Sequence, residues 1–248
     1  MKVILVGYGR MGKMIEELLA ARTDVEILGA VSPGLYESPW DVPGKPDAII
    51  DFSYPGNLEN TLARAEDAAS AVILGTTGLT AEQVERVGAA ARRVPVVFDA
   101  NFSLGVAVLR KALAQVGPLL LKCGFDAEIV ETHHNRKADA PSGTAKALLR
   151  AIDPAGDYAP VYGREGFVGA RGKEIGVHAV RGGTVAGEHR ALFFGEDETL
   201  EFRHLAASRR IFAAGAVRAL DFAVGRAPGL YRVDDVLGLN DIRGGENP

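Results

Sequence analysis

Residues 1–12 read MKVILVGYGRMG, a pattern typical of a strand, a tight turn and the start of a helix. A short apolar run, Val3 to Val6, predicts a buried strand, and the segment from Lys13 to Ala21 predicts the helix that follows. The turn between them carries three glycines, which suit a tight turn, a close approach of backbone to a pyrophosphate, and close helix–strand packing. We therefore expect a dinucleotide site, with the anion at the helix N-terminus, formed by Gly7, Tyr8, Gly9, Arg10, Met11 and Gly12.

The same turn also satisfies the glycine and lysine positions of a nucleoside triphosphate loop, from Gly7 to Lys13. Such a loop needs a hydroxyl at the next position to hold magnesium. Met14 stands there instead, so we set that alternative aside.

Short apolar runs continue to alternate with helical stretches as far as residue 104. Continuous apolar strands joined by helices are typical of a parallel sheet that is covered on both faces. We expect a doubly wound (Rossmann) dinucleotide-binding domain over residues 1–104. Its predicted strands are 3–6, 27–31, 48–52, 71–74 and 94–98, and its helices are 13–21, 58–69 and 81–92.

The pattern changes after Leu104, which predicts a second domain of the α+β class over residues 105–213. Alternation of apolar and polar residues at 175–179 and 200–204 predicts strands with one exposed face, and hence a mostly antiparallel sheet. We assign substrate binding and oligomerisation to this domain. Helices are expected at 106–121 and after Gly143, a strand at 127–131, and a glycine-rich segment at 162–173. A last helix at 211–224 and the tail, about 214–248, are expected to return to the first domain.

Composition narrows the function classes. The 248 residues are 47% hydrophobic, carry a formal net charge of -4 and have a pI near 5.8, so no basic excess favours nucleic acid as a partner. The N-terminus lacks a signal peptide and no later run reaches membrane-spanning length, so we expect a cytoplasmic protein with no membrane partner. The single cysteine, Cys123, excludes an intrachain disulfide and is interpreted as an inert thiol.

Cofactor preference stays open at this stage. Ser32 stands about twenty residues past Gly12, where an acidic residue would bind the ribose 2'-hydroxyl of NAD. A serine can bond a hydroxyl or a 2'-phosphate, and Arg10 and Lys13 offer positive charge for a phosphate. Glu37 is a further candidate, in a loop that the sequence does not place. The expected cofactor is therefore NADH or NADPH.

Small and hydroxyl-bearing residues follow two later strands. Ligands of open α/β sheets bind outside the carboxyl ends of the strands, so these residues are candidates for the nicotinamide–ribose site, although ordinary turn chemistry explains them equally well. The candidates are Gly75, Thr76, Thr77, Ala100, Asn101 and Phe102.

The densest cluster of reactive side chains is the loop from Glu131 to Ala145. His133 and His134 supply groups that titrate near neutrality, and Lys137 supplies a mobile cation. Ser142 suits an N-cap, and the N–H groups of Gly143 and Thr144 at the helix start suit a carboxylate. This combination predicts a pocket for a small dianionic substrate.

Two other chemistries fit this loop poorly. Adjacent histidines rarely share one zinc ion and no further ligand stands at the right spacing, so we expect no metal. Ser142 lacks the Gly-x-Ser-x-Gly turn of a hydrolase.

The loop and the segments around it resemble the 4-hydroxy-tetrahydrodipicolinate (dihydrodipicolinate) reductase family of lysine and diaminopimelate biosynthesis. The resemblance extends over nearly the whole chain. It is carried by residues 7–12, 51–53, 75–78, 101–106, 131–145, 181–184, 187–189, 228–231 and 234–237.

The resemblance implies roles for individual residues. His133 would be the proton donor and acceptor, Lys137 the proton donor, and His134 a substrate contact together with the Gly143–Thr144 backbone. The family's members are typically homotetramers that reduce a cyclic, doubly carboxylated substrate with loss of water. Two departures stand out: Ser32 is neutral where many members carry a charge, and the segment from 32 to 47 is short and lacks a helix.

Two rival functions remain from the residues alone. One is a module that senses the nucleotide without turnover. The other is a dehydrogenase acting on an amino-acid semialdehyde, whose chemistry needs a cysteine nucleophile that Cys123 is poorly placed to supply.

Overall fold

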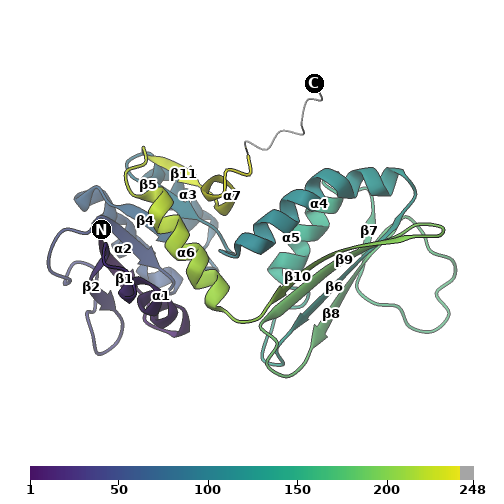
Figure 1. The fold of residues 1–248 in the computed structure, drawn as a ribbon, viewed down its shortest axis with the longest axis horizontal. Coiled ribbons are helices and arrows are strands. Elements are labelled where there is room, and N and C mark those ends of the chain that lie inside the picture. Colours follow the sequence, from purple (N-terminus) through teal and green to yellow (C-terminus); the bar gives the residue numbers. More distant parts are fainter. Residues whose placement is uncertain (241–248) are drawn as a thin grey trace. The chain divides into compact units, whose positions relative to one another are not determined.

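The computed structural model describes residues 1–240, which divide into two compact units. Unit 1 comprises Met1–Leu104 and the segment from Arg210 onward, and unit 2 comprises Gly105–Arg209 (Figure 1). The tail predicted to return to the first domain includes residues 241–248, which lie outside the described residues.

Unit 1 is built on a six-stranded sheet in the order β11-β5-β4-β3-β1-β2, and its paired strands are all parallel. The expected doubly wound class is confirmed. Its elements are β1 (Lys2–Val6), α1 (Arg10–Ala20), β2 (Glu26–Val31), β3 (Ala48–Asp51), the short 3-10 helix η1 (Pro55–Asn57), α2 (Leu58–Ala68), β4 (Ala71–Leu74), α3 (Ala81–Ala91), β5 (Pro95–Phe98), α6 (Arg210–Ala223), β11 (Gly229–Tyr231) and α7 (Val233–Val236).

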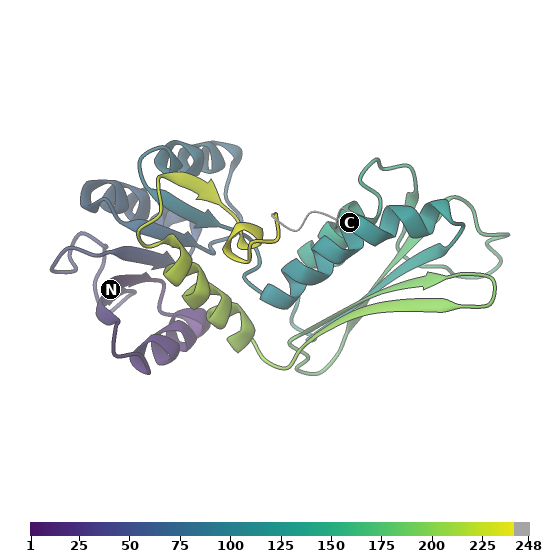
Figure 2. The same cartoon turned by 45° about the horizontal axis from the view of Figure 1, so that its top comes forward.

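Helices cover both faces of this sheet (Figures 1 and 2). Helices α1 and α6 lie side by side on one face, and α2 and α3 pack together on the other. Helix α6 approaches closely because it is lined with small residues: a Cβ on Gly215 would lie 1.7 Å from the carbonyl oxygen of Phe102. Strands β1, β3, β4 and β5 are buried almost completely, as the continuous apolar runs predict, whereas the edge strands β2 and β11 are only partly buried.

The connection between β2 and β3 has no helix. Prolines at 33, 39, 43 and 46 interrupt residues 32–47, and proline cannot continue a helix interior. The segment instead forms turns, with an isolated bridge between Val31 and Tyr36. This shorter path places Glu37 close to the end of β2.

Unit 2 is a five-stranded sheet in the order β10-β9-β6-β8-β7, with helices on one face. The sheet is mixed, and not mostly antiparallel as expected: β9 pairs antiparallel with β10 and β6, whereas β8 pairs parallel with β6 and β7. Its elements are α4 (Leu104–Lys122), β6 (Asp126–His133), α5 (Gly143–Ile152), β7 (Ala159–Val161), β8 (Glu174–Arg181), β9 (Gly187–Phe194) and β10 (Thr199–Ala206).

Strand β9 was missing from the sequence prediction. Its buried positions carry Gly187, His189 and Ala191 before the large Phe193, so the alternation of apolar and polar residues is weak. The other face of β9 is only partly buried, in agreement with the predicted exposed face of this sheet.

Helix α4 is long and apolar enough to contradict the expectation that no run reaches membrane-spanning length. By length and composition alone it suffices to cross a membrane, with a mean hydropathy of 1.5 over its apolar window, so a run of spanning length does exist. The helix nevertheless carries Arg110 and Lys111 near its middle. Leu109, Leu113 and Leu121 pack into the core between α4, α5 and the sheet, so we interpret α4 as a core helix of unit 2.

Candidate active site

In the glycine turn after β1, close packing requires glycine at two of the three glycine positions. Gly7 has a φ of +88°, and a Cβ on it would lie 2.6 Å from the carbonyl oxygen of Phe52. A Cβ on Gly12 would lie 2.1 Å from the carbonyl oxygen of Gly7. A Cβ on Gly9 would meet no atom within 4 Å. Gly9 therefore keeps backbone bare toward open space, as close approach of a pyrophosphate requires.

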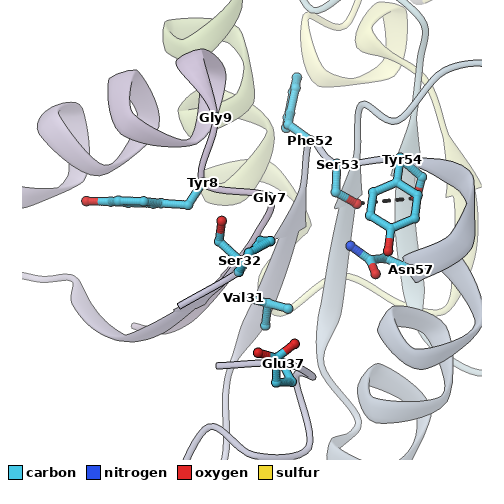
Figure 3. Close-up of a pocket in the computed structure, with 11 residues that line it drawn as sticks. Gly7, Tyr8, Gly9, Val31, Ser32, Glu37, Phe52, Ser53, Tyr54 and Asn57 are labelled. Carbon is cyan, nitrogen blue, oxygen red and sulfur yellow. Dashed lines mark hydrogen bonds between the residues drawn. The ribbon is translucent and has the colours of Figure 1, made fainter. Parts of the chain in front are cut away.

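A cavity of about 350 Å³ lies beside this turn, at the carboxyl ends of β1, β2 and β3 (Figure 3). Four of the predicted cofactor residues line it: Gly7, Tyr8, Gly9 and Ser32. The remaining lining residues are Val31, Pro33, Glu37, Phe52, Ser53, Tyr54 and Asn57. Among the residues that line this cavity, Glu37 is the only one with a charged side chain.

The other predicted cofactor residues lie outside the lining of this cavity. They are Arg10, Met11, Gly12, Gly75, Thr76, Thr77, Ala100, Asn101 and Phe102. Gly75 lets the Phe52 ring pack closely, since a Cβ there would lie 2.3 Å from that ring. Phe102 is buried with its ring centroid 5.2 Å from that of Phe52. Both residues therefore support the wall of the cavity through Phe52.

The buried carboxylate of Asp51 organises this end of the sheet. Its Oδ1 accepts hydrogen bonds from the Ser53 amide at 3.0 Å, the Ser53 hydroxyl at 2.6 Å and the Thr76 hydroxyl at 2.8 Å. Its Oδ2 accepts one from the Thr61 hydroxyl at 2.7 Å. The Thr76 side chain is thus engaged inside the protein. Sequence reasoning did not assign a role to Asp51, because a strand-end acid carries no spacing signal of its own.

The polar loop of unit 2 is built around a second buried carboxylate, that of Glu131, which is 0% exposed. His133 Nδ1 lies 2.5 Å from Glu131 Oε2. Arg181 donates two hydrogen bonds to the same carboxylate, at 2.8 and 2.7 Å, and the Ser142 amide donates a third at 3.0 Å. One carboxylate therefore holds the end of β6, the end of β8 and the start of α5 together.

Backbone hydrogen bonds fix the loop to the turn that connects β8 and β9. The Gly182 amide donates to the His133 carbonyl at 2.9 Å, and the His134 amide donates to the Val185 carbonyl at 2.8 Å. The Asn135 amide donates to the Gly183 carbonyl at 3.2 Å. These hydrogen bonds fix the backbone positions of His133 and His134.

Two cations flank the histidines. The Lys137 ammonium lies 2.8 Å from Asp139 and is close enough to His133 to lower the pKa of that imidazole. Hydrogen bonding from Lys137 lowers the pKa of Asp139. The Arg209 guanidinium lies 2.9 Å from His134 Nε2. Arg209 was not predicted, since it is distant in sequence from the loop.

Helix α5 starts beside these groups. The Ser142 hydroxyl caps it by accepting from the Ala145 amide at 3.1 Å, as its N-cap pattern predicts. Gly143 and Thr144 form the first turn, which holds no acidic side chain. The positive end of the helix dipole therefore lies at this turn, where it would stabilise a carboxylate.

His189 is a neutral imidazole behind this site. It is 4% exposed, and burial lowers its pKa to about 4, with a smaller contribution from the charge of His133. Its ring lies edge-on to that of His133 at 5.1 Å between centroids, and its Nε2 lies 3.2 Å from the Ser142 hydroxyl. In the sequence, His189 belongs to residues 187–189, one of the segments that carry the family resemblance, and no separate role was predicted for it.

The depressed pKa of His189 predicts an acid-labile unit 2. In the unfolded chain the residue binds its proton near its ordinary value of 6.5, but in the fold only near 4. Its stabilising effect is therefore complete above about pH 6.5 and is lost as the pH falls toward 4. Between about pH 7 and pH 5 the wild type should lose about 2 kcal/mol more free energy of unfolding than His189→Gln in urea titrations. Equal losses in both proteins would contradict this assignment.

Comparison with known proteins uses both units. Residues 1–102 match the family model described as dihydrodipicolinate reductase, N-terminus, and residues 105–237 match dihydrodipicolinate reductase, C-terminus. The chain belongs to the dihydrodipicolinate reductase family. A 4-hydroxy-tetrahydrodipicolinate reductase from Exiguobacterium sp. is 40% identical over 242 residues, covering 95% of this chain and 95% of that protein. Another from Akkermansia muciniphila is 41% identical over 243 residues, covering 94% and 96%.

A solved member of the dihydrodipicolinate reductase family has the same fold. The dipicolinate-bound enzyme from Paenisporosarcina sp. TG-14 matches with a TM-score of 0.74 at 22% identity, over 98% of this chain and 99% of that chain. The resemblance stated from the sequence motifs is confirmed.

Proposed function

We propose that this chain reduces 4-hydroxy-tetrahydrodipicolinate to tetrahydrodipicolinate, with release of water and with NADH or NADPH as hydride source. The similar curated proteins carry that activity in their names, and the solved relative from Paenisporosarcina binds dipicolinate, a small ring with two carboxylates. The observation that carries the proposal is the arrangement of the unit 2 loop. There His133 is hydrogen-bonded to the buried carboxylate of Glu131 and lies next to Lys137 and the start of α5.

Recognition of the substrate falls to cationic groups of unit 2. His134, Arg209, Lys137 and the first turn of α5 at Gly143 and Thr144 would bind the two carboxylates. Lys137 now pairs with exposed Asp139, an interaction that is weak in water. A substrate carboxylate would take the place of Asp139 on the ammonium.

His133 and Lys137 would supply the proton chemistry. Loss of the 4-hydroxyl and a C3 proton, together as water, would leave a C3=C4 double bond conjugated with the ring imine. Bound in unit 1, the reduced nicotinamide would supply hydride to C4 of that double bond. Negative charge then builds at C3, and Lys137 or His133 delivers the proton that neutralises it. With the 4-hydroxyl leaving as water, the overall reaction consumes one hydride and one proton.

The cavity of unit 1 suits a dinucleotide. Gly9 presents backbone without a Cβ, and the turn leads into the N-terminus of α1, where an anion is stabilised. Glu37 adds a carboxylate to the lining. A carboxylate accepts hydrogen bonds from ribose hydroxyls and repels a 2'-phosphate, so we propose that NADH binds better than NADPH.

Replacing Glu37 should therefore change the cofactor preference. The Glu37→Arg variant is expected to raise kcat/KM for NADPH relative to NADH by about tenfold or more, because a repulsive charge becomes an attractive one. Steady-state rates with both nucleotides measure the ratio. Glu26→Gln, an exposed acid on β2, is the matched control and should leave the ratio unchanged. An unchanged ratio in Glu37→Arg would exclude Glu37 from the nucleotide site.

We further propose a cytoplasmic homotetramer that forms through unit 2. The face of the sheet that no helix covers leaves large apolar residues exposed, including Val180 and Leu205, and Phe167 projects fully exposed from the glycine-rich segment. Patches of this kind mark interaction surfaces. Light scattering should give four times the chain mass, and a monomeric mass would exclude this arrangement.

The decisive assay follows loss of reduced-nicotinamide absorbance with freshly generated 4-hydroxy-tetrahydrodipicolinate. Saturable oxidation of NADH or NADPH that depends on this substrate supports the function. Tight nucleotide binding without any turnover would instead favour a nucleotide-sensing module.

A further inference from the structure

We infer that Glu131 is a positioning residue, which holds the Nδ1 proton of His133 so that Nε2 is the atom that exchanges protons with substrate. This inference deepens the proposed function, because it rests on His133 as a proton-carrying group. The family resemblance makes His133 a proton donor and acceptor, but it does not specify which ring nitrogen acts or what selects that nitrogen.

Hydrogen-bond counting at Glu131 supports this tautomer. The carboxylate is 0% exposed and receives N–H donors from Arg181 and Ser142. Burial by itself raises the pKa of Glu131, but the hydrogen bonds from Arg181, His133 and Ser142 together hold it below its usual range. An ionised carboxylate only accepts hydrogen bonds. His133 Nδ1, 2.5 Å from Oε2, must therefore carry a proton.

The other ring nitrogen of His133, Nε2, faces the backbone of Gly187. Gly187 lies next to Nε2, where a Cβ would approach to 3.1 Å. In the neutral imidazole Nε2 then carries the lone pair, and in the imidazolium it carries the proton to be donated. Because residue 187 is a glycine, no Cβ at this position of β9 crowds Nε2.

The groups around His133 shift its pKa in opposite directions. Burial lowers the pKa of His133, Glu131 raises it, and Lys137 and Arg181 lower it. His189 faces the ring as a neutral group. Glu131 is thus the group that keeps the imidazole basic enough to accept a proton in a buried, cation-rich site.

Glu131 also pairs with Arg181, so a purely structural role must be distinguished from positioning. If the ion pair merely joined β6 to β8, loss of either partner would affect His133 alike. If Glu131 positions the proton, the two losses act oppositely. Glu131→Gln removes the negative charge and one of the two acceptor oxygens but leaves the Arg181 cation, whereas Arg181→Gln removes the cation and leaves the carboxylate.

The test is the imidazole nitrogen spectrum of the full-length protein labelled with 15N-histidine, with the His133 signals assigned by their loss in His133→Gln. In the wild type at high pH, His133 should be the Nδ1–H tautomer. Glu131→Gln should lower the His133 pKa by about one unit or more and reduce the fraction of this tautomer. Arg181→Gln should raise the pKa and retain the tautomer.

Turnover gives the second readout. Glu131→Gln should lower kcat about tenfold or more with little change in the KM for the dicarboxylate. The matched control is Glu128→Gln on the same strand, which breaks a similar cluster in which Glu128 bonds His178 at 2.6 Å and also pairs with Arg164. That control should leave kcat and the His133 signals unchanged.

An Nε2–H tautomer in the wild type would overturn the inference, as would pKa shifts in the same direction for both variants. These spectra need no substrate, so the inference can fail while turnover persists. Equally, the tautomer can be as expected in a protein that fails to reduce the dicarboxylate, which would refute the proposed function alone.

Discussion

Replacing Lys137 with methionine is expected to lower kcat by about 10²- to 10⁴-fold, the range for loss of a positioned proton-transfer group. Methionine keeps the length of the side chain but removes the charge. The ammonium sits beside His133 in unit 2, where it would hold a carboxylate and carry a proton. Steady-state rates with saturating nucleotide measure the loss.

Binding of the nucleotide should survive this change, because the cavity of unit 1 contains no residue of the loop. The Kd for NADH is expected to stay within about twofold of wild type, whereas kcat falls with the loss of proton transfer and the KM for the dicarboxylate rises with the loss of a carboxylate contact. Lys146→Met, an exposed lysine on α5, is the matched control and should turn over normally. A Lys137→Met protein with near-normal kcat would remove this residue from the mechanism.

Adding a single methyl group at Gly9 is expected to weaken nucleotide binding about tenfold or more, because the backbone there must come close to a pyrophosphate. The Gly9→Ala substitution should leave the fold intact. Its φ of -78° suits alanine, and the new Cβ meets no protein atom within 4 Å. Titration of NADH by nicotinamide fluorescence gives the Kd, and thermal melting reports the fold.

The other glycines make good comparisons. Gly88→Ala in α3 also adds a Cβ in open space but lies away from the cavity lining, so the Kd should not change. Gly12→Ala places a Cβ 2.1 Å from a carbonyl oxygen and should destabilise unit 1 itself. If Gly9→Ala bound NADH as tightly as wild type, the pyrophosphate would lie elsewhere.

Much of unit 1 could be predicted because its signals are local. Continuous apolar runs predicted β1 to β5 closely, and the glycine turn predicted where the first helix begins, although α1 starts at Arg10, three residues earlier than expected. The mixed sheet of unit 2 was harder. Strand direction and order depend on contacts between β6, β8 and β9 that no local pattern encodes, and the weak alternation of β9 hid that strand.

In the candidate site too, residues close together in sequence could be predicted and residues from distant positions could not. The loop from Glu131 to Ala145 was identified because its reactive residues are adjacent in sequence. Its partners Arg181, His189 and Arg209 come from distant positions and meet the loop only through the sheet. Glu37 was noticed but not placed, since only the helix-free connection brings it beside Ser32.

The proposed reaction moves hydride from a reduced nicotinamide onto a cyclic dicarboxylate. The most direct measurement uses NADH deuterated at both C4 positions, with 4-hydroxy-tetrahydrodipicolinate generated in the same vessel and mass spectrometry of the product. We predict tetrahydrodipicolinate that carries one deuterium for each NAD formed. Oxidation of the nucleotide without deuterium in that product, or no oxidation at all, would contradict the account.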